Sequence, residues 1–342
     1  MREAGFQRIT PGRHCQSKPG LFFARSPLNP ARSPAEESGA RRAMGFTIAH
    51  ITDPHLGPAP MPGLADFRLK RLMGYVNWKR ARERLNDMGL LERLVEDLRA
   101  QRADHVAVTG DLINIGMPAE FRRAAAWMKT LGDPCDVSFV PGNHDAYVRP
   151  AMPLLAAAFA PWTTGDSGSV DFPYLRVRGE IAIIGLSSGV PTAPLMATGR
   201  LGARQIGAFA DLLEETGAKG LARVVLIHHP PLAAGARPLR GLTDAPAFER
   251  VVRALGVEAV LHGHSHKQMV RFLRTAASRS CDGAIPVFCA PSAAAMAQDL
   301  RRRAAYHLVR IEREDGRWRV RARVRGLQPD GHAIGEREAL AV

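Results

Sequence analysis

The chain has 342 residues, of which 46% are hydrophobic and 23% charged, a balance typical of a globular protein. This composition excludes wholesale disorder, a collagen-like repeat and a coiled coil. The 47 Lys and Arg against 33 Asp and Glu leave a net charge of +14, which favours anionic or phosphate-bearing partners without specifying a fold. The apolar runs are too short for a membrane-spanning helix or a secretory signal, so we expect a cytoplasmic protein.

The composition divides the chain into three parts. Residues 1–43 are rich in Gly, Pro, Ser and basic side chains and lack apolar periodicity, so we expect a disordered N-terminal extension. Met44 precedes the first predicted strand and is an alternative start; a targeting segment is another interpretation of the extension. Residues 44–326 have the pattern of one folded domain, and 327–342 are expected to be a C-terminal tail.

Strand-like and helix-like segments alternate through the predicted domain. Short apolar runs predict strands over 46–52, 105–109, 137–140, 181–186, 224–227, 257–261 and 285–289. Helical periodicity predicts helices over 90–98, 118–131, 204–215 and 244–255. The alternation indicates an α/β domain with largely parallel, buried strands. Near the C-terminus, 306–311 and 317–325 are expected to form an antiparallel hairpin around Asp315-Gly316.

Metal-binding types of side chain follow five of these predicted strands. In chain order they are Asp53 and His55, Asp111, Asn143 with His144 and Asp145, His228 with His229, and His264 with His266. Because ligands of α/β sheets bind outside the carboxyl ends of the strands, these side chains should meet at one rim. Residues two apart in extended backbone point to the same side, which favours shared directions within the first and last pairs. Carboxylate, amide and imidazole groups together suit Mn, Fe or Zn, and their number fits two ions better than one.

The ordered set of motifs resembles the calcineurin-like metallophosphoesterase family, and within it the members grouped with class III cyclic-nucleotide phosphodiesterases. The matching blocks are Asp53-Pro54-His55, Gly110-Asp111, Gly142-Asn143-His144-Asp145, His228-His229-Pro230 and Gly263-His264-Ser265-His266, all within residues 46–291. The resemblance implies a four-layer αββα sandwich. Two mixed β-sheets would be flanked by helices, with a dinuclear metal centre at the C-terminal ends of the strands.

The resemblance also implies roles for these residues. The metal sets would be Asp53, His55 and His266 for one ion, Asn143, His228 and His264 for the other, and Asp111 as the bridge. Two such divalent ions would share a hydroxide that attacks a phosphate ester in line. His144 would assist the leaving group, and Asp145 would either orient His144 or shape the turn. His229 is expected to support its neighbour rather than to bind metal.

Residues 57–89 form a basic insert after the first motif. Leu69, Leu72, Met73 and Val76 fall at i, i+3, i+4 and i+7, which predicts an amphipathic helix with Lys and Arg at its other positions. It is either an ordinary helix packed on the core, a lid that grips a phosphate substituent above the metals, or a helix that rests on an anionic membrane.

Several substrate classes remain open at this stage. A small phosphodiester, with cyclic nucleotides first, is favoured because the resemblance is to phosphodiesterases. A phospholipid or nucleotide-linked lipid, met by a peripheral membrane protein, is the alternative that the insert suggests. Nucleic acid is less favoured as a substrate because only the net charge suggests it. A non-catalytic scaffold function is disfavoured because all seven ligand positions are filled. The five arginines of 317–325 alternate with apolar residues and should share one face, which is either the solvent side of a sheet or a contact for a polyanion or a membrane.

Overall fold

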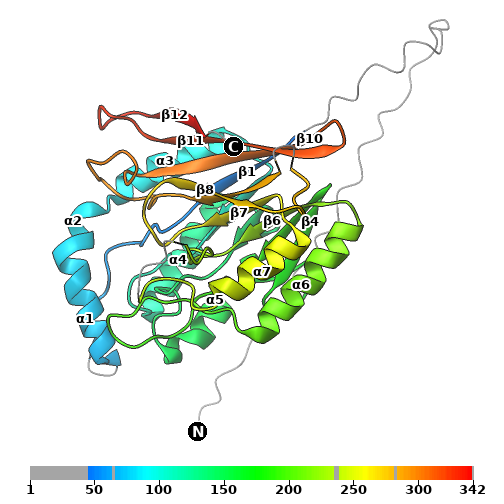
Figure 1. Cartoon of the computed structure of the whole chain (residues 1–342). Helices are drawn as coiled ribbons and strands as arrows, with labels where there is room; N and C mark the ends of the chain where they lie inside the picture. The colour runs from blue at the N-terminus through cyan, green and yellow to red at the C-terminus, as the bar shows by residue number, and fades with distance from the viewer. Residues whose placement is uncertain (1–44, 64–65, 235–238, 281–282, 341–342) are drawn as a thin grey trace, which may run out of the picture.

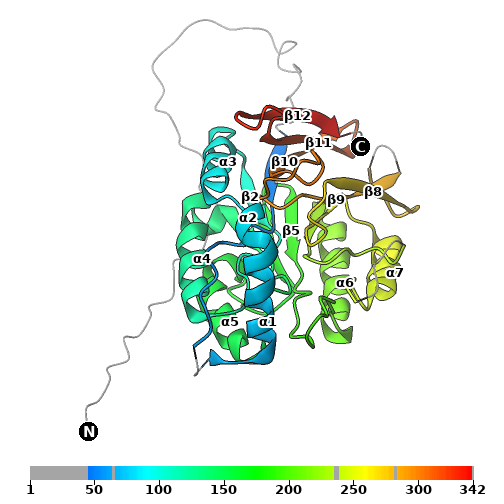
Figure 2. The same cartoon turned by 90° about the vertical axis from the view of Figure 1, so that its left-hand side faces the viewer.

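The computed structural model describes residues 45–63, 66–234, 239–280 and 283–340. Two six-stranded sheets pack face to face, and helices cover both outer faces (Figures 1 and 2). In the view of Figure 2, α3, α4 and α5 lie on one side of the sheets, and α6 and α7 on the other. The predicted αββα sandwich is therefore confirmed. The expected N-terminal extension lies outside the described residues.

The first sheet has the strand order β12-β11-β10-β1-β2-β3. Its strands are β1 (Phe46–Ile51), β2 (His105–Val108), β3 (Val137–Phe139), β10 (Ala305–Glu314), β11 (Arg317–Leu327) and β12 (Ile334–Leu340). β1, β2 and β3 are mutually parallel neighbours, and the remaining pairs are antiparallel. The expected tail is thus wrong in part, because β12 belongs to the sheet. None of its residues is buried, and Glu336, Arg337 and Glu338 at its centre interrupt any apolar alternation; it is held by backbone pairing with β11.

The second sheet has the order β4-β5-β6-β7-β9-β8. Its strands are β4 (Tyr174–Arg178), β5 (Ile181–Gly185), β6 (Ala222–Leu226), β7 (Ala259–His262), β8 (Met269–Arg274) and β9 (Ala284–Cys289). The four inner strands are parallel and almost wholly buried, which is why short apolar runs predicted them. The edge strands β4 and β8 are antiparallel to their neighbours and partly exposed, and the sequence analysis missed both.

Five longer helices cover the sheets. They are α3 (Met88–Ala100), α4 (Pro118–Leu131), α5 (Met152–Thr163), α6 (Ala203–Ala218) and α7 (Ala245–Leu255), with short 3-10 turns η3 (Pro134–Asp136) and η4 (Arg149–Ala151). The first three pack on one face of β1 and β2, and the last two pack on β5, β6, β7 and β9. A third apolar layer, which includes Ile48, Val224 and Phe288, fills the space between the sheets. α5 was not predicted, because it is apolar on most sides rather than amphipathic.

The basic insert forms one continuous helical run of α1 (Leu69–Asn77), η2 (Trp78–Arg82) and α2 (Glu83–Leu85), in which η2 is a π-helical turn. It stands at one side of the sandwich (Figure 1). The predicted helix exists, but its apolar stripe does not pack on the core: Leu72 and Met73 are exposed, whereas Arg71 is buried. The interpretation as an ordinary helix packed through its apolar face is therefore wrong.

The β10–β11 hairpin matches the prediction, with its turn at Asp315-Gly316. The alternating arginines of β11 face solvent or its boundary, while Trp318, Val320, Ala322 and Val324 are buried. Acidic side chains pair with several of them, such as Glu336 with Arg323. Within the described part of the chain, no helix has the length and apolarity needed to cross a membrane.

Candidate metal centre

The predicted site residues lie in the loops that leave the carboxyl ends of the parallel strands. Five of them adopt the left-handed backbone region that non-glycine residues rarely occupy: Asp53, His55, Asp111, His264 and His266, with φ between 42° and 67°. Such conformations cost free energy and are concentrated at functional sites. The expectation that the Asp53/His55 and His264/His266 pairs lie in extended backbone is therefore wrong. Left-handed turns in the loops orient these side chains instead.

Two motif glycines permit the close packing of these loops. A Cβ built on Gly142 would strike the carboxylate of Asp111, and one on Gly263 would strike Thr52 and Asp53. Only hydrogen fits at these two positions, so the glycines keep the strand ends close enough to share ligands.

The first cluster contains Asp53, His55, Asp111 and His266, whose candidate ligand atoms all lie within 4.8 Å of one another. His266 Nε2 lies 3.0 Å from Asp53 Oδ1, and His55 Nε2 lies 3.1 Å from His266 Nε2. Two imidazole nitrogens and a carboxylate oxygen converge on one point, which suits a divalent cation. This set equals the predicted ligands of the first ion together with the predicted bridge.

The second cluster lies beside the first. His228, His229 and His264 have ligand atoms within 4.8 Å of one another. Asp111 Oδ2 lies 3.4 Å from His228 Nε2 and 3.8 Å from His55 Nε2, so this carboxylate stands between the clusters, where a bridge is expected. The presence of His229 differs from the supporting role that the sequence suggested.

Unpaired polar atoms mark the second cluster as a fit for metal. Asn143 Oδ1 and His229 Nε2 are buried without a hydrogen-bond partner among the described residues. Buried polar atoms without partners are rare in proteins and need an explanation such as an ion. His228 Nδ1 lies 2.6 Å from the carbonyl oxygen of Thr109, which leaves Nε2 to face the cluster, as in many histidines that bind metal.

The charges of the site also favour a cation. Burial and the neighbouring His228 lower the pKa of His264 to about 3, which keeps this imidazole neutral, the form that binds metal. Burial would also lower the pKa of His228, but the carboxylates of Asp111 and Asp53 outweigh it and raise that pKa to about 9. The two buried carboxylates thus attract positive charge, as a proton or as a metal ion.

His144 lies at the edge of the first cluster. Its Nδ1 donates to the carbonyl oxygen of Asn114 at 2.6 Å, and its ring stacks on Tyr147. These contacts fix the ring so that Nε2 faces the guanidinium of Arg82. Burial and the nearby guanidinium of Arg82 lower the pKa of His144 to about 3, so the side chain is neutral near pH 7.

Asp145 has a different place from the one expected for an orienting group. Its carboxylate accepts hydrogen bonds from the backbone N–H groups of Asp111, Leu112 and Gly142 at 2.7 to 2.9 Å. These bonds tie the loop after β2 to the loop after β3, while the Asn114 carbonyl takes the expected role toward His144. The alternative structural interpretation of Asp145 is therefore the one that its contacts support.

Arg82 is the site residue that the sequence analysis missed. Its Nη2 lies 3.0 Å from His144 Nε2, and its Nη1 lies 3.3 Å from His55 Nδ1. The π-helical turn widens the helix at this point, and such turns are frequent at functional sites. The sequence marked Arg82 only as one of several basic residues of the insert, since no motif distinguishes it from Arg80 or Arg84.

A cavity of about 180 Å³ opens beside His55 and Arg82. Residues of the insert and the start of α3 line it. Besides His55 and Arg82, the lining residues are Gly57, Pro58, Trp78, Glu83, Asn86 and Met88. It offers space for part of a substrate between the first cluster and the insert, with a guanidinium and an indole in its wall.

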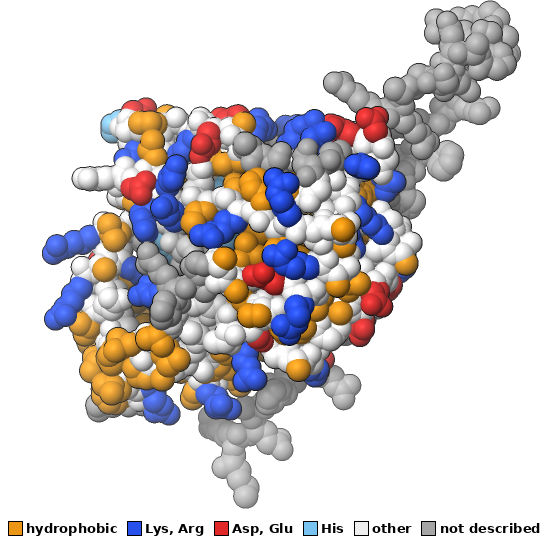
Figure 3. All heavy atoms as spheres, in the orientation of Figure 1, with side chains coloured by type: hydrophobic (Ala, Val, Ile, Leu, Met, Phe, Trp, Pro, Cys, Tyr) orange, Lys and Arg blue, Asp and Glu red, His pale blue; other side chains and the backbone are white. Residues whose placement is uncertain are grey.

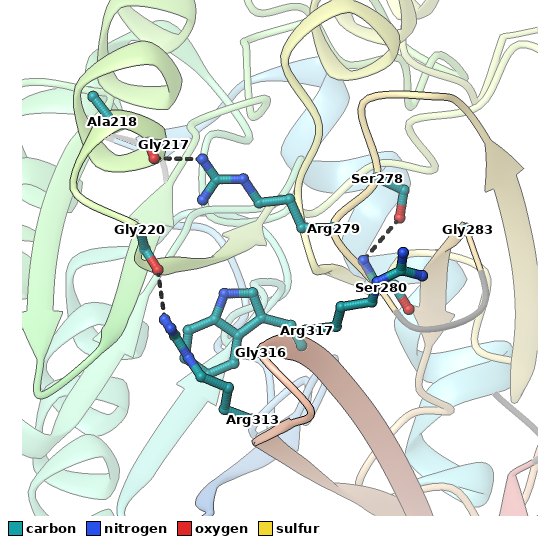
Figure 4. Close-up of a pocket in the computed structure, with 11 residues that line it drawn as sticks. Gly217, Ala218, Gly220, Ser278, Arg279, Ser280, Gly283, Arg313, Gly316 and Arg317 are labelled. Carbon is teal, nitrogen blue, oxygen red and sulfur yellow. Dashed lines mark hydrogen bonds between the residues drawn. The ribbon is translucent and has the colours of Figure 1, made fainter.

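A separate cavity of about 570 Å³ lies at the opposite end of the strands, near the β10–β11 turn (Figure 4). Arg313 donates to the carbonyl oxygen of Gly220, and Arg279 to that of Gly217. Arg313 thus holds the β10–β11 hairpin, and Arg279 the loop between β8 and β9, to the C-terminal end of α6 and the residues just after it. The cavity takes no part in the candidate metal centre.

Comparisons with known proteins agree with this geometry. A family model described as calcineurin-like phosphoesterase matches residues 46–268. A probable cyclic nucleotide phosphodiesterase from Synechococcus is 29% identical over 69% of this chain and 79% of that protein. A cAMP/cGMP dual specificity phosphodiesterase from Mycobacterium tuberculosis is 28% identical over 65% of this chain and 62% of that protein.

Among solved structures, a dimetal phosphatase from Danio rerio superposes with a TM-score of 0.55 at 16% identity, covering 86% of this chain and 98% of that one. This likeness supports the fold. The family model covers most of the described sandwich and includes all the strand-end motifs from Asp53 to His266. The chain therefore belongs to the calcineurin-like phosphoesterase family and is a metal-dependent phosphoester hydrolase.

Proposed function

We propose that the protein is a phosphodiesterase of small substrates, with a cyclic nucleotide as the expected class. The observation that carries the proposal is that a His/Asp cluster and a cluster of three histidines lie on either side of the Asp111 carboxylate, with the guanidinium of Arg82 beside the first. The names of the two curated relatives support the cyclic-nucleotide class.

The proposed ligands divide as the clusters do. Asp53, His55 and His266 would hold one ion, Asn143, His228 and His264 would hold the other, and Asp111 would be shared between them. His229 is a further candidate ligand of the second ion, because its buried Nε2 has no hydrogen-bond partner among the described residues. When bound, a pair of divalent ions supplies a hydroxide near neutral pH and neutralises charge on the phosphoryl oxygens.

Arg82 and His144 are proposed to hold the phosphodiester from the side of the insert. The fork of a guanidinium matches two phosphoryl oxygens, and this one reaches the wall of the cavity beside the first cluster. His144 Nε2 accepts from Arg82 and so fixes the guanidinium in place. Because His144 is neutral in the free protein, a role as proton donor to the leaving alkoxide requires that the anionic substrate first favours its protonation.

A substrate panel tests this proposal. The protein is reconstituted with Mn²⁺, and hydrolysis of bis-p-nitrophenyl phosphate is compared with that of p-nitrophenyl phosphate, then with cAMP, cGMP and a short oligonucleotide. We expect the diester to be preferred over the monoester and a cyclic nucleotide to be cleaved. A strong preference for the monoester would contradict the phosphodiesterase assignment, and cleavage of the oligonucleotide alone would replace it with a nuclease.

Metal analysis of the same preparation gives an independent control. Two ions per chain are expected for the wild type, and Asp111→Asn should lower the content because it weakens the proposed bridge. Retention of two ions together with normal activity in Asp111→Asn would contradict the ligand assignment.

A further inference from the structure

In helix α1, cationic side chains face the protein and apolar side chains face solvent, the reverse of an ordinary surface helix. Its cationic residues point inward: Lys70 Nζ donates to the carbonyl oxygens of Tyr147 and Thr192, both at 2.8 Å. Arg71 is buried and donates to the carbonyl oxygen of Gly116 at 2.6 Å. Backbone carbonyls, together with the carboxylate of Asp66 at 3.2 Å from Arg71 Nη1, therefore satisfy the charges that would normally face water.

The outward face of the same helix is apolar. We name as the α1 apolar surface the exposed hydrophobic residues Phe67, Leu69, Leu72, Met73 and Val76. Leu69 is 62% exposed, and the other four are 37% to 50% exposed. Figure 3 shows hydrophobic side chains gathered at the lower left of the molecule, where Figure 1 draws the lower part of α1 and the loops beside it.

Packing fixes this orientation from the inner side. Tyr147 Oη donates to the carbonyl oxygen of Lys70 at 3.0 Å, and a Cβ built on Gly74 would strike the same hydroxyl group. Trp78, one turn further on, is buried. Rotation of the helix to bury its leucines would break these contacts, so the apolar face stays in solvent unless another surface covers it.

The charges around the α1 apolar surface identify the kind of surface that fits. Arg68, Lys79, Arg80 and Arg84 are exposed on the same helical segment. Arg80 and Arg84 form no hydrogen bond or ion pair with the residues that the structure describes, whereas Glu83 is paired with Lys79. Figure 3 shows Lys and Arg side chains projecting along the left edge above the hydrophobic patch. An apolar face bordered by cations is typical of a helix that lies in the interface of an anionic bilayer.

We propose that α1 docks the protein on anionic lipid membranes, with the α1 apolar surface inserted among the acyl chains and the four exposed basic residues against the headgroups. The apolar contact supplies hydrophobic free energy, and the basic residues supply attraction to anionic lipid that salt screens. Because Arg82 belongs to the same helical run, docking holds the cavity beside the metal centre close to the bilayer surface.

Vesicle co-sedimentation tests the proposal with the full chain. Vesicles of phosphatidylcholine with 30% phosphatidylglycerol are compared with pure phosphatidylcholine at low and high salt. The combined variant Leu69→Gln, Leu72→Gln and Val76→Gln should bind the anionic vesicles at least tenfold more weakly, since Gln keeps helix propensity and removes the apolar face. Phe272→Gln is the matched control, because Phe272 is 45% exposed on the distant strand β8.

Charge reversal separates the two contributions. Arg68→Glu with Arg80→Glu should remove the preference for anionic over neutral vesicles while leaving the α1 apolar surface intact. The Gln variant should retain the wild-type melting temperature and its rate on bis-p-nitrophenyl phosphate; if it does not, the single change Leu69→Gln at the most exposed position replaces it.

Two results would overturn the proposal. One is failure of the wild type to bind anionic vesicles, or equal binding by the wild type and a folded Gln variant. The other is a dimer in light scattering that the Gln variant converts to monomer without any vesicle binding, which would assign the α1 apolar surface to a second copy of the chain.

Discussion

Arg82 gives the sharpest test of how the insert acts on the reaction. Its two Nη atoms lie 3.0 to 3.4 Å from nitrogens of His144 and His55, so the guanidinium lies at the edge of the first cluster, where we propose that it contacts the phosphodiester. Arg82→Ala removes this cation without removing a proposed metal ligand. A hydrogen bond to a charged group is worth about 1.5–3 kcal/mol, and loss of about 3 kcal/mol lowers kcat/KM by about 100-fold.

Arg82→Lys should lower kcat/KM by only about tenfold, because the ammonium keeps the charge but lacks the planar fork that fits two oxygens. The assay is steady-state hydrolysis of bis-p-nitrophenyl phosphate by the Mn²⁺-loaded protein, with metal content and melting temperature measured on the same samples. Arg122→Ala on α4 is the control, since Arg122 is exposed and away from the site residues described above.

Two outcomes would refute this reasoning. Wild-type kcat/KM in Arg82→Ala would show that the guanidinium does not contact the substrate. A loss of metal in proportion to the loss of activity would show instead that Arg82 acts by holding the ligands in place.

Three further predictions concern the residues around the centre and the sheet that supports it. His144→Ala should retain both metal ions and lose most turnover, because His144 is no proposed ligand; a matched fall in metal content would contradict this. Asp145→Ala leaves the buried N–H groups of Asp111, Leu112 and Gly142 without acceptors, at a cost of about 1–3 kcal/mol each. The free energy of unfolding measured by urea denaturation should therefore fall by at least about 3 kcal/mol. A fall below about 1 kcal/mol would refute the structural role of Asp145. Burial would raise the pKa of Asp97, but hydrogen bonds from Arg325 and Tyr306 outweigh it and lower that pKa. Since the folded-state pKa is depressed, this carboxylate stabilises the fold above its unfolded pKa of about 4 and loses that contribution as the pH falls through the folded value. The difference in unfolding free energy between wild type and Asp97→Asn should therefore shrink below pH 4, and a constant difference would contradict the linkage.

The residues that gather at the candidate metal centre were largely predictable, because short motifs next to single strands specify them. Each candidate ligand follows a buried strand within a few residues, and parallel strands bring their carboxyl ends to one rim of the sheet. The glycines next to Asp111 and His264 belong to the same short motifs, since only glycine allows the loops to approach so closely. The composition and the short apolar runs likewise determined the class of the fold.

The tertiary structure alone decided which way the insert faces. Periodicity in α1 defines two faces, but it does not state which one is inside. The usual rule placed Leu72 inward and Arg71 outward, and the protein does the reverse because carbonyl oxygens at Ile115 and Gly116 accept hydrogen bonds from the buried guanidinium. The same holds for Arg82, whose approach to His144 depends on a contact between residues 62 positions apart.

The meaning of the net charge of +14 was settled in the same way. Sequence alone located the positive charge in the extension, the insert and one strand. The structure then separated the arginines of β11, several of which pair with acidic neighbours, from Arg82 at the metal centre and from the cations that border the α1 apolar surface. Sequence fixes how many charges a segment carries, whereas only packing determines which are neutralised by partners and which remain to attract an anion.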